Sequence, residues 1–549
     1  MRSLLRYAVL AAVLVLPSTQ FLTRPLSFAP TINVTINKNP STGYVLIAPT
    51  GTDGNGPYIY DKAGNLVWDG AGVVGGADSY NFHVCTYDGS PHLCLTAGLG
   101  HQGYAIGTAM ILDANYRIIT SVQTGGAGNY ADQHEFQVLA GGNTAVLSSY
   151  RSIPYDMTAM PYGVTMQQGF LMDSMFQEID IRSGQVVFEW YASDHVPLNH
   201  SRVYPRSFGQ VGDGYSGHSP FDYFHINSID KSTKSLMYLV SARHTNSVYA
   251  INSSTHDIVW RLACPGTMPT SPSNFACQGF NFSSQHDARW VREDTDTTTI
   301  SLFDNANNGV NQTDLISTGM IIDLNHKTGK AVLRLRSLPT ASNVGQSVSQ
   351  GNFQALPNGD YFFGYGSSQA FGEQFINSKG YFEVNYAATW TTGADSVGKT
   401  MCYRTFSYDW TSTPANTVPA VYVYAQKIGS ANTIYVSWNG ATTVAQWAFY
   451  AADDKFGNYT KVGTTKKNGF ETMWTAPKYS RWWRVDALDQ FGIPLRSSAN
   501  SDTYVPSPAL VGACGSTGCP IGPAWTASTS SSTLSAPETT TATAAPKPT

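Results

Sequence analysis

The sequence predicts an all-β protein, a six-bladed β-propeller followed by a small β-sandwich of the fibronectin or immunoglobulin type. Three observations predict this class. Short strand-like segments recur along the chain between turns rich in Gly, Asn and Asp. Glycine (50 residues) and aromatic side chains (12%) suit tight turns and half-buried pleated faces, whereas only 13% of the residues are charged. The length of 549 residues exceeds what one core usually holds, so a second domain is expected.

Residues 1–22 predict a signal peptide. Arg2 and Arg6 precede an apolar run from Tyr7 to Leu16, and a proline and small polar residues follow. The run is too short to span a bilayer comfortably, and no later segment approaches transmembrane length. An uncleaved signal anchor is the weaker alternative. We therefore expect a secreted, extracellular protein, free or associated with the cell wall, with no membrane contact after removal of the signal.

The strand-like segments form a degenerate repeat of two hairpins. One half is a strand, a Gly/Asn/Asp turn and a second strand, as in residues 135–150, 225–244 and 352–367. The other half is a strand, a turn and a second apolar or aromatic strand, as in residues 58–70, 178–192, 248–262 and 321–335. Two hairpins make a four-stranded antiparallel sheet, and repetition of such sheets is typical of a propeller.

Six repeat units are counted between residues 43 and 410, the expected propeller domain. They span roughly 43–70, 81–121, 134–192, 225–262, 285–337 and 352–410. The second and sixth units match the pattern least well, so five or seven blades stay open. A β-helix is the competing repeat fold, but its rungs are shorter than these uneven units.

A second domain is expected at residues 418–505, and a tail at residues 506–549. Short strands, regular turns and a strand-borne Trp438 predict the β-sandwich. The tail consists largely of Ser, Thr, Ala and Pro, which cannot bury a core, so we expect it to be disordered and O-glycosylated. It ends without a hydrophobic run and therefore carries no lipid-anchor signal.

Sequons and cysteines agree with export into an oxidising compartment. The N-x-S/T sequons predict glycosylation at Asn33, Asn199, Asn252, Asn281, Asn311 and Asn458. The simplest pairing of neighbouring cysteines gives the disulfides Cys85–Cys94, Cys264–Cys277 and Cys514–Cys519. Cys402 is left over, and we expect it to be free and buried. Spacing alone does not settle the pairing.

Several other classes of function find no support in the sequence. The formal net charge of −4 gives no electrostatic footprint for nucleic acid. Residues 98–103 match G-x-G-x-x-G, but a β-like segment follows where a dinucleotide fold needs a helix. The chain has no P-loop and no G-x-S-x-G elbow, and the acidic turn at residues 294–296 lacks the Gly and final Glu of a calcium loop. We expect no cofactor.

Histidines fall at corresponding positions of several repeat units. The predicted inner strands begin with His134, His225 and His286, and His83 begins the weaker second unit. In a propeller the inner strand lines the central channel, and the second strand returns to the same face. The ends of the second strands carry Tyr150–Arg151, Arg243–His244 and Asp304–Asn305. We therefore expect these side chains to converge at one channel mouth.

A histidine cluster can also bind zinc or copper. No H-E-x-x-H motif is present, and Arg243 would disfavour a cation next to these histidines. We therefore predict no metal site. His101 is either a loop residue or a distant member of the channel set.

The spacing of the channel residues resembles that of the aryl-sulfate sulfotransferase family. The matching residues are H225-x-N227, then R243-H244, then Q285-H286-D287. The similarity runs from about residue 80 to about residue 390 and is closest to the secreted eukaryotic, fungal-type branch. The large periplasmic members have a different N-terminal region and lack this C-terminal sandwich and tail. The resemblance implies a six-bladed propeller that transfers sulfuryl groups between phenols without a nucleotide donor.

The resemblance also implies roles for individual residues. His286 would accept the sulfuryl group, which makes the expected mechanism covalent, and His225, Asn227 and Arg243 would hold the sulfate. His134 would be a further channel histidine. The catalytic set is then His286, His225 and Arg243, and the substrate-binding set is His134, Asn227, Tyr150, His244 and Asn305.

Two other functions remain as alternatives. A cluster of His, Arg and Tyr suits proton abstraction beside a carboxylate, as in polysaccharide lyases built on propellers. A non-catalytic, wall-associated or carbohydrate-binding glycoprotein would also suit the sandwich and the tail. The expected partner is accordingly a small anionic substrate, aromatic or carbohydrate.

Overall fold

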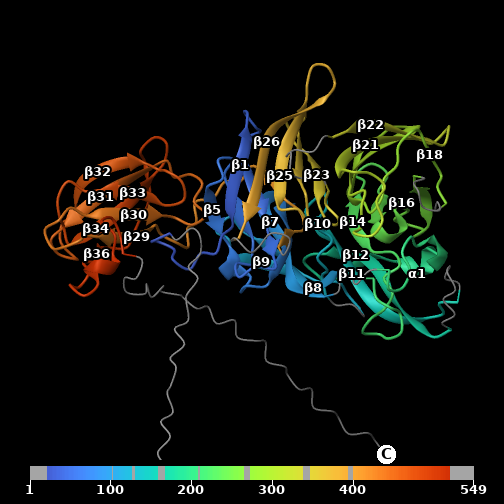
Figure 1. Cartoon of the computed structure of the whole chain (residues 1–549), viewed down its shortest axis with the longest axis horizontal. Helices are drawn as coiled ribbons and strands as arrows, with labels where there is room; N and C mark the ends of the chain where they lie inside the picture. Colours follow the sequence, from blue (N-terminus) through green and yellow to red (C-terminus); the bar gives the residue numbers. More distant parts are fainter. Residues whose placement is uncertain are drawn as a thin grey trace, which may run out of the picture.

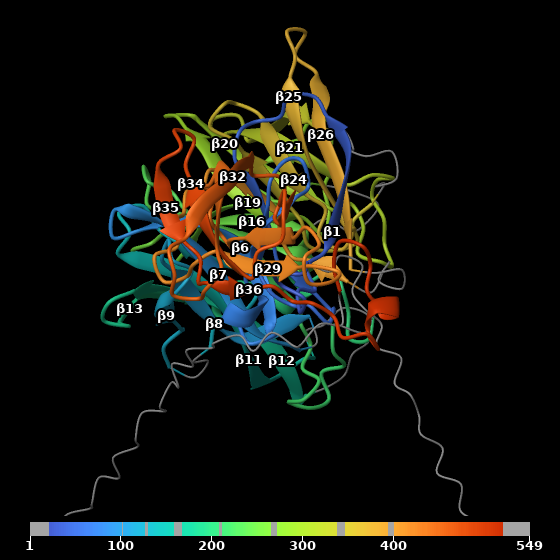
Figure 2. The ribbon, with the colours of Figure 1, turned by 90° about the vertical axis from the view of Figure 1, so that its left-hand side faces the viewer.

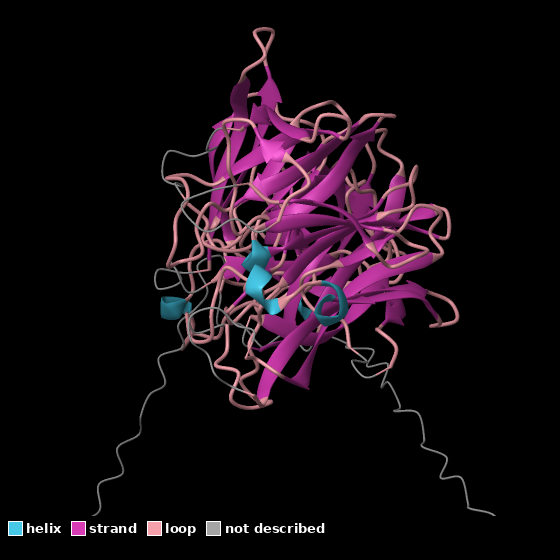
Figure 3. Cartoon of the chain, turned by 90° about the vertical axis from the view of Figure 1, so that its right-hand side faces the viewer, coloured by secondary structure: helices cyan, strands magenta, loops and turns pink. Residues whose placement is uncertain are grey.

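The computed structural model describes residues 21–101, 103–126, 130–158, 167–207, 211–264, 272–337, 346–392 and 400–519. Within these ranges strands dominate and helices are few and short, so the predicted all-β class is confirmed (Figure 3). The helical elements there are α1 (Ala192–His195) and the 3₁₀ turns η1 (Ala71–Val73), η2 (Leu198–His200), η3 (Arg243–Thr245) and η4 (Val511–Ala513). The expected signal peptide, apart from its last two residues, and the tail beyond residue 519 lie outside the described residues.

Six antiparallel sheets follow one another between residues 31 and 408. The first contains β28 (Phe406–Tyr408), β2 (Tyr44–Ile47), β4 (Tyr58–Tyr60) and β5 (Leu66–Asp69). The second contains β6 (Asp78–Tyr87), β7 (Ser90–His101), β8 (Tyr104–Leu112) and β9 (Ile118–Val122). The third contains β10 (Phe136–Val138), β11 (Thr144–Tyr155), β12 (Gly169–Asp180) and β13 (Val186–Tyr191).

The remaining three sheets have four or five strands each. The fourth contains β14 (Ile226–Lys231), β15 (Tyr238–Ala242), β16 (Ser247–Ile251) and β17 (Ile258–Leu262). The fifth contains β19 (His286–Glu293), β20 (Thr297–Asp304), β21 (Thr318–Asn325) and β22 (Lys330–Arg336), with β18 (Ala276–Cys277) parallel to β22. The sixth contains β23 (Asn352–Ala355), β24 (Tyr361–Gly364), β25 (Ala370–Ile376), β26 (Phe382–Thr391) and β1 (Thr31–Asn37).

Each sheet shares a hydrophobic cluster with the next one along the chain. Val146 and Phe176 of the third sheet, for example, belong to one cluster with Tyr249 of the fourth. A further cluster joins the sixth sheet to the first, through residues such as Phe371 and Val45. Period-2 alternation supplies both faces of every sheet with apolar side chains for these contacts.

Two strands belong to other sheets than the repeat units suggest. β28 lies at the end of the sixth expected unit but pairs with β2, so it supplies the inner strand of the first sheet. β1 precedes residue 43 and pairs with β26 as the outer strand of the sixth sheet. The short pair β3 (Pro49–Thr50) and β27 (Met401–Cys402) adds a second link between the two ends of this region.

Residues 420–502 form two further sheets around a separate core. One contains β29 (Ala420–Tyr424), β30 (Thr433–Ser437) and β33 (Thr472–Thr475). The other contains β32 (Thr460–Lys466), β31 (Gln446–Ala452), β34 (Trp482–Leu488), β35 (Pro494–Ser497) and β36 (Ser501–Asp502). Trp447 and Trp483 are buried between them.

The C-terminal sheets lie at one end of the molecule beside the first sheet (Figures 1 and 2). The Tyr116 hydroxyl donates to the Gly440 carbonyl at 2.7 Å and accepts from Trp410 Nε1 at 3.0 Å. The Asn439 amide bonds the main chain of Asp69 in both directions. These buried contacts fix the C-terminal unit on the larger one.

The structure contains the disulfides Cys85–Cys94, Cys264–Cys277 and Cys514–Cys519, and the Cys402 thiol is free and buried. In the described part of the chain, no helix has the length and apolar character needed to cross a membrane.

Candidate active site

Three histidines from successive sheets meet at one cavity. His134 lies two residues before the start of β10, His225 directly precedes β14, and His286 is the first residue of β19. The cavity has a volume of about 220 Å³. Its walls are formed by Thr50, Tyr80, Gly100, His101, Gly103, Tyr104, Gln133, His134, His225, Arg243, His286, Ser349, Gln350 and Met401. Equivalent positions on consecutive sheets therefore converge, as the repeat predicts.

The structure brings some of the expected site residues to the cavity wall and leaves others behind it. His134, His225, Arg243 and His286 line the cavity, and so does His101. The residues outside the wall are Asn227, Tyr150, His244 and Asn305. Each of these four is buried against the lining residues, as described below.

His286 has a fixed orientation because both ring nitrogens have partners. Its Nδ1 lies 2.7 Å from Asn305 Oδ1 and 3.0 Å from the Ser284 carbonyl. Asn305 Nδ2 donates to the carbonyls of Ser347 and Gln350, so its Oδ1 is the end that faces the ring. Nδ1 therefore carries the hydrogen, and Nε2 keeps its lone pair. The main-chain N–H of Gln350 donates to Nε2 at 3.2 Å.

Burial, together with the nearby Arg243 guanidinium, lowers the pKa of His286 well below its usual range. The ring is thus neutral at neutral pH. A neutral imidazole with a free electron pair at Nε2 is a nucleophile.

His134 is held by a buried carboxylate. Its Nδ1 lies 2.5 Å from Asp132 Oδ2, and its main-chain N–H donates to the same oxygen at 2.9 Å. Asp132 also accepts from Ser148 Oγ at 3.1 Å and from the Ala105 N–H at 2.8 Å. The His134 ring stands edge-on to His225, with the ring centroids 4.7 Å apart.

His225 and His244 share the carboxyl residue Asp222. His225 Nδ1 bonds Asp222 Oδ2, and His244 Nδ1 bonds the Asp222 carbonyl oxygen at 2.7 Å. Burial raises the pKa of Asp222 to about 6. Burial lowers the pKa of His225 and of His244 well below their usual range. Both rings are therefore neutral at neutral pH.

Arg243 brings a positive charge to the cavity from η3, the turn between β15 and β16. Its Nη1 donates to His244 Nε2 at 3.0 Å, and its Nη2 donates to the Val348 carbonyl at 3.0 Å. Burial lowers the pKa of Arg243 to about 10, so the guanidinium stays charged at neutral pH. The turn ends at Asn246 (φ +47°), whose Oδ1 accepts from the N–H of Ser284 and so fixes the approach to His286.

Two residues that line the cavity have strained backbone conformations. His225 (φ +57°) and Gln350 (φ +66°) adopt the left-handed conformation, which costs about 1 kcal/mol or more for residues with a Cβ. Such strain persists only where the surrounding structure enforces it.

Tyr150 and Asn227 serve the scaffold next to the cavity. The Tyr150 hydroxyl donates to the Ile226 carbonyl, and burial raises its pKa well above the usual range. Asn227 Nδ2 donates to the Gln285 carbonyl at 2.7 Å, which ties β14 to the segment before β19. Asn227 Oδ1 has no hydrogen-bond partner among the described residues.

His83 does not join the histidine cavity. The residue of β6 that lines it is Tyr80, and the pairing of β6 with β7 shifts register between Tyr80 and His83. His83 instead lines a second cavity of about 350 Å³, together with Glu135, Asp287 and other residues. Because of this bulge, Tyr80 and not His83 lies at the first cavity. The position of His83 at the start of the second repeat unit therefore gives a wrong prediction of its place.

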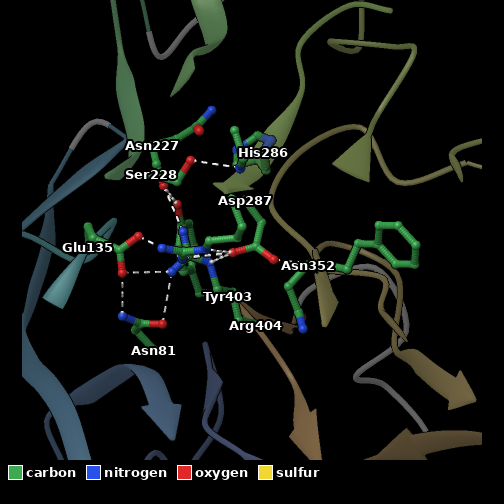
Figure 4. A network of polar contacts seen from close by, with 12 residues as sticks. Asn81, Glu135, Asn227, Ser228, His286, Asp287, Asn352, Tyr403 and Arg404 are labelled. Atoms are coloured by element: carbon green, nitrogen blue, oxygen red, sulfur yellow. Dashed lines mark hydrogen bonds and ion pairs between the residues drawn. The ribbon is translucent and has the colours of Figure 1, made fainter. Parts of the chain in front are cut away.

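A buried ionic network includes residues that line the second cavity (Figure 4). Arg404 Nη1 bonds Glu135 Oε1 at 3.1 Å and Asn81 Oδ1 at 3.0 Å, and Arg404 Nε lies 3.5 Å from Asp287 Oδ1. Arg289 bonds Glu135 and Asp287 as well. Two guanidinium groups thus balance two carboxylates. His134 and His286 face the first cavity, whereas the residues directly after them, Glu135 and Asp287, face the second.

Sequence reasoning missed Asp132, Asp222, Tyr80 and Tyr104. A signal for the two aspartates exists in the chain, since both precede a cavity histidine closely, in D132-Q-H134 and D222-Y-F-H225. Tyr104 is the first residue of β8, and the next residue of this strand contacts the segment before the third sheet, because the Ala105 N–H donates to Asp132. Nothing in the local sequence of β8 indicates that contact.

Asp222, His225 and His244 are the described side chains whose donor atoms lie close enough together to share a cation. Both imidazole Nδ1 atoms are already bonded to Asp222, and the Arg243 guanidinium bonds His244 Nε2. A cation here would face that positive charge. The donor set fits a hydrogen-bonded network better than a metal centre, and we assign no metal to it.

A known protein family matches the part of the chain that contains His134, His225, Arg243 and His286. Residues 83–385, a little over half of the chain, match the family model described as Arylsulfotransferase (ASST). No curated protein matches the chain significantly.

The chain is also similar to several distantly related solved structures. A protein of unknown function from Bacteroides caccae is 12% identical, with a TM-score of 0.37 over 66% of this chain and 98% of that chain. A protein from Lactobacillus plantarum is 11% identical, with a TM-score of 0.34 over 79% and 99%. The β-propeller domain of Cps50 (Swd1) from Myceliophteria thermophila is 11% identical, with a TM-score of 0.29 over 58% and 88%. These scores are too low to support an argument.

Proposed function

The chain belongs to the arylsulfotransferase (ASST) family, and from that premise we propose that it is a secreted sulfotransferase of the fungal-type branch. It moves a sulfuryl group from an aryl sulfate to a phenolic acceptor without a nucleotide donor. His286 carries the group between the two half-reactions.

In this proposal the six sheets are the blades of a propeller, and residues 418–505 are a fibronectin-like or immunoglobulin-like sandwich. The ring of shared hydrophobic clusters, which includes the one between the sixth and first sheets, supports six blades. The pairing of β28 with β2 closes the first blade with a strand from the end of the region. The propeller then begins at β1, before residue 43.

His286 Nε2 attacks the sulfur of the donor. An N–S bond forms, the bond between sulfur and the aryl oxygen breaks, and the phenolate leaves with the electron pair. In the second half-reaction the acceptor phenol loses its proton, its oxygen attacks the same sulfur, and the N–S bond breaks. Such double displacement predicts ping-pong kinetics.

Arg243 is proposed to hold the three outer sulfuryl oxygens, over which negative charge is spread in the transition state, and His225 is proposed to bond one of them when its Nε2 carries a proton. Arg243 is positively charged and lines the cavity beside His286. His244 orients Arg243 through the Nη1 contact, and Asn305 orients His286. Asn227 and Tyr150 support this wall from behind, through the Gln285 and Ile226 carbonyls.

The proposed route to the outside is secretion with glycosylation, to the medium or the cell wall. Three disulfides are compatible with this route. All six sequon asparagines are exposed or half-buried, so a glycan could be attached to each. The cavity of about 220 Å³ suits a small aromatic anion as substrate.

One observation carries this function, namely that His286, which burial and Arg243 keep neutral, lines the same cavity as Arg243. The test is incubation with a chromogenic aryl sulfate and a phenol acceptor between about pH 5 and about pH 9. We expect phenol release, ping-pong kinetics and a trapped enzyme whose mass has increased by one sulfuryl group at His286.

His286→Ala should lower turnover by about 10³-fold or more. His92→Ala, at a hairpin outside the cavity, is the matched control and should turn over normally. No phenol release by the native protein across this pH range would overturn the proposal.

A further inference from the structure

The three cavity histidines differ in what holds their Nδ1 atoms. Nδ1 of His134 meets the carboxylate of Asp132, and Nδ1 of His225 meets the carboxyl of Asp222. Nδ1 of His286 meets the side-chain amide of Asn305 instead. All six of these side chains are buried.

The hydrogen-bond partners indicate that the imidazole hydrogen is on Nδ1 in His134, His225 and His286. Asp132 accepts hydrogen bonds from the Ala105 and His134 N–H groups and from Ser148 Oγ, so it acts toward His134 as an acceptor too. The Asn305 amide cannot turn over, because its Nδ2 faces two carbonyl oxygens at 2.9 and 2.8 Å. Nε2 is therefore the nitrogen without a hydrogen in His134 and His225 as well as in His286, where it accepts the Gln350 N–H.

The two kinds of partner have opposite consequences when Nε2 meets a proton. A carboxylate at Nδ1 stabilises the imidazolium that forms, whereas a neutral amide gives no such stabilisation. A ring with a carboxylate partner can thus take up a proton during the reaction, even where burial keeps it neutral at rest, as in His225. A ring with an amide partner has no such stabilisation and remains the nucleophile.

We propose that Asp132 and Asp222 are positioning residues that make His134 and His225 the proton carriers of the reaction, whereas Asn305 reserves His286 for attack on sulfur. This inference rests on the proposed sulfuryl transfer and assigns the proton path within the same site. His134 or His225 takes the proton of the acceptor phenol while its oxygen bonds to sulfur. The proton is later given to a departing phenolate, so no external acid is consumed.

Several other groups face these rings and would influence any pH profile. His134 is packed against Tyr150 from β11, His225 from the fourth sheet and Tyr403 from the segment before β28. His286 lies near Arg243 from η3 and Tyr403. His225 lies next to His244. The tests below compare variants at fixed pH, so that these groups stay constant.

The first test is Asp132→Asn, assayed by rapid mixing with 4-nitrophenyl sulfate as donor. The side-chain NH₂ group of this variant must face either the Ala105 N–H or the His134 N–H. In the first orientation His134 Nδ1 meets a neutral amide oxygen instead of a carboxylate. In the second, Nδ1 meets a hydrogen-bond donor, so the imidazole hydrogen must move to Nε2. The donor half-reaction needs little acid help because nitrophenolate is a good leaving group, so the burst of nitrophenol should be retained. Turnover with phenol as acceptor should fall by about 10²-fold.

The acceptor series separates proton transfer from a structural defect. A phenol that is already ionised at the assay pH needs no base, so the loss in Asp132→Asn should shrink toward wild-type rates as the acceptor becomes more acidic. Asp222→Asn should behave in the same way. Asn305→Ala should instead lose the burst with every acceptor. An equal loss with all acceptors in Asp132→Asn and Asp222→Asn would overturn the inference.

Asp230→Asn is the matched control, because Asp230 is a carboxyl of β14 that bonds Trp290 and does not line the histidine cavity. It should change neither the burst nor the acceptor dependence. If Asp230→Asn reproduces the acceptor dependence of Asp132→Asn, the inference is wrong.

A measurement without turnover keeps the inference distinct from the proposed function. Nitrogen-15 spectra of histidine-labelled full-length protein report which ring nitrogen carries the proton. We expect His134, His225 and His286 as Nδ1–H tautomers, with His134 altered in Asp132→Asn. An Nε2–H tautomer of His134 in the native protein would overturn the inference even if phenol is released. Absence of phenol release with the expected tautomers would overturn the proposed function, and the proton path with it, but not the tautomer assignment.

Discussion

Asp304 is a buried carboxyl directly before Asn305, the residue that holds His286. Its Oδ1 accepts from the N–H groups of Ser283 and Ala306, whereas its Oδ2 has no hydrogen-bond partner among the described residues. Arg336 Nη2 is 3.9 Å from Oδ2. Burial raises the pKa of Asp304 to about 7. At the residue scale, the neighbour of the asparagine that orients His286 is thus a carboxyl group, Asp304, whose neutral form is favoured by burial.

We predict that Asp304→Asn stabilises the protein at alkaline pH. In the unfolded chain Asp304 loses its proton near pH 4, whereas the folded protein retains it up to about pH 7. The free energy of unfolding of the wild type therefore falls as the pH rises from about 4 to about 7. The variant does not show this fall, because an asparagine side chain does not titrate. Urea unfolding should show a gain of about 1 to 3 kcal/mol at about pH 8 and little difference near pH 4. The same gain at both pH values would contradict the prediction.

At the scale of elements, the inner strands are joined by charge as well as by main-chain pairing. Arg404, just before β28, bonds Glu135 before β10 and approaches Asp287 of β19. Arg289 of β19 bonds the same two carboxylates. Three elements that are distant in sequence therefore depend on one another's charges, and Arg404, Glu135 and Asp287 are buried.

Arg404→Met should destabilise the fold by about 3 kcal/mol, because it leaves two buried carboxylates with one guanidinium. Arg182→Met is the control, since Arg182 forms an ion pair with Asp88 in which both side chains are about two-thirds exposed. That change should cost less than about 0.5 kcal/mol. Urea unfolding measures both, and similar losses in the two variants would refute the structural role given to Arg404.

At the scale of the whole molecule, the two C-terminal sheets contact the first sheet through tightly packed groups. Gly440 (φ +86°) lies so close to Tyr116 that a Cβ would come within 2.2 Å of its ring. Trp410 and Trp68 pack on the same tyrosine. We therefore expect the two parts to unfold together.

Gly440→Ala should uncouple the two parts, so that calorimetry shows two transitions where the native protein shows one. Gly492→Ala is the control, because Gly492 (φ +79°) has the same left-handed backbone but no atom within 4 Å of a new Cβ. It should lower the Tm of the sandwich slightly and keep a single transition. Two transitions in the control would show that backbone strain, and not the lost contact, separates the parts.

The sequence predicted the site only where one strand of a repeat marks it. His134, His225 and His286 stand at corresponding starts of repeat units, and Arg243 ends a second strand, so alignment of the units brought them together. The same alignment failed for His83, because a bulge after Tyr80 displaces it toward the second cavity. A shift of register inside one strand leaves no trace in the order of residue types.

The sequence by itself determined the all-β class, because turn residues and strand alternation are local properties, and it indicated the family through residues spaced along two repeat units. Only the tertiary structure decided which strands complete the first and sixth sheets, since β28 and β1 pair across more than 300 residues. It also decided what stands behind each histidine, with carboxylates at His134 and His225 and an amide at His286. Those contacts depend on side-chain direction and on the packing of one sheet against the next, which no local pattern encodes.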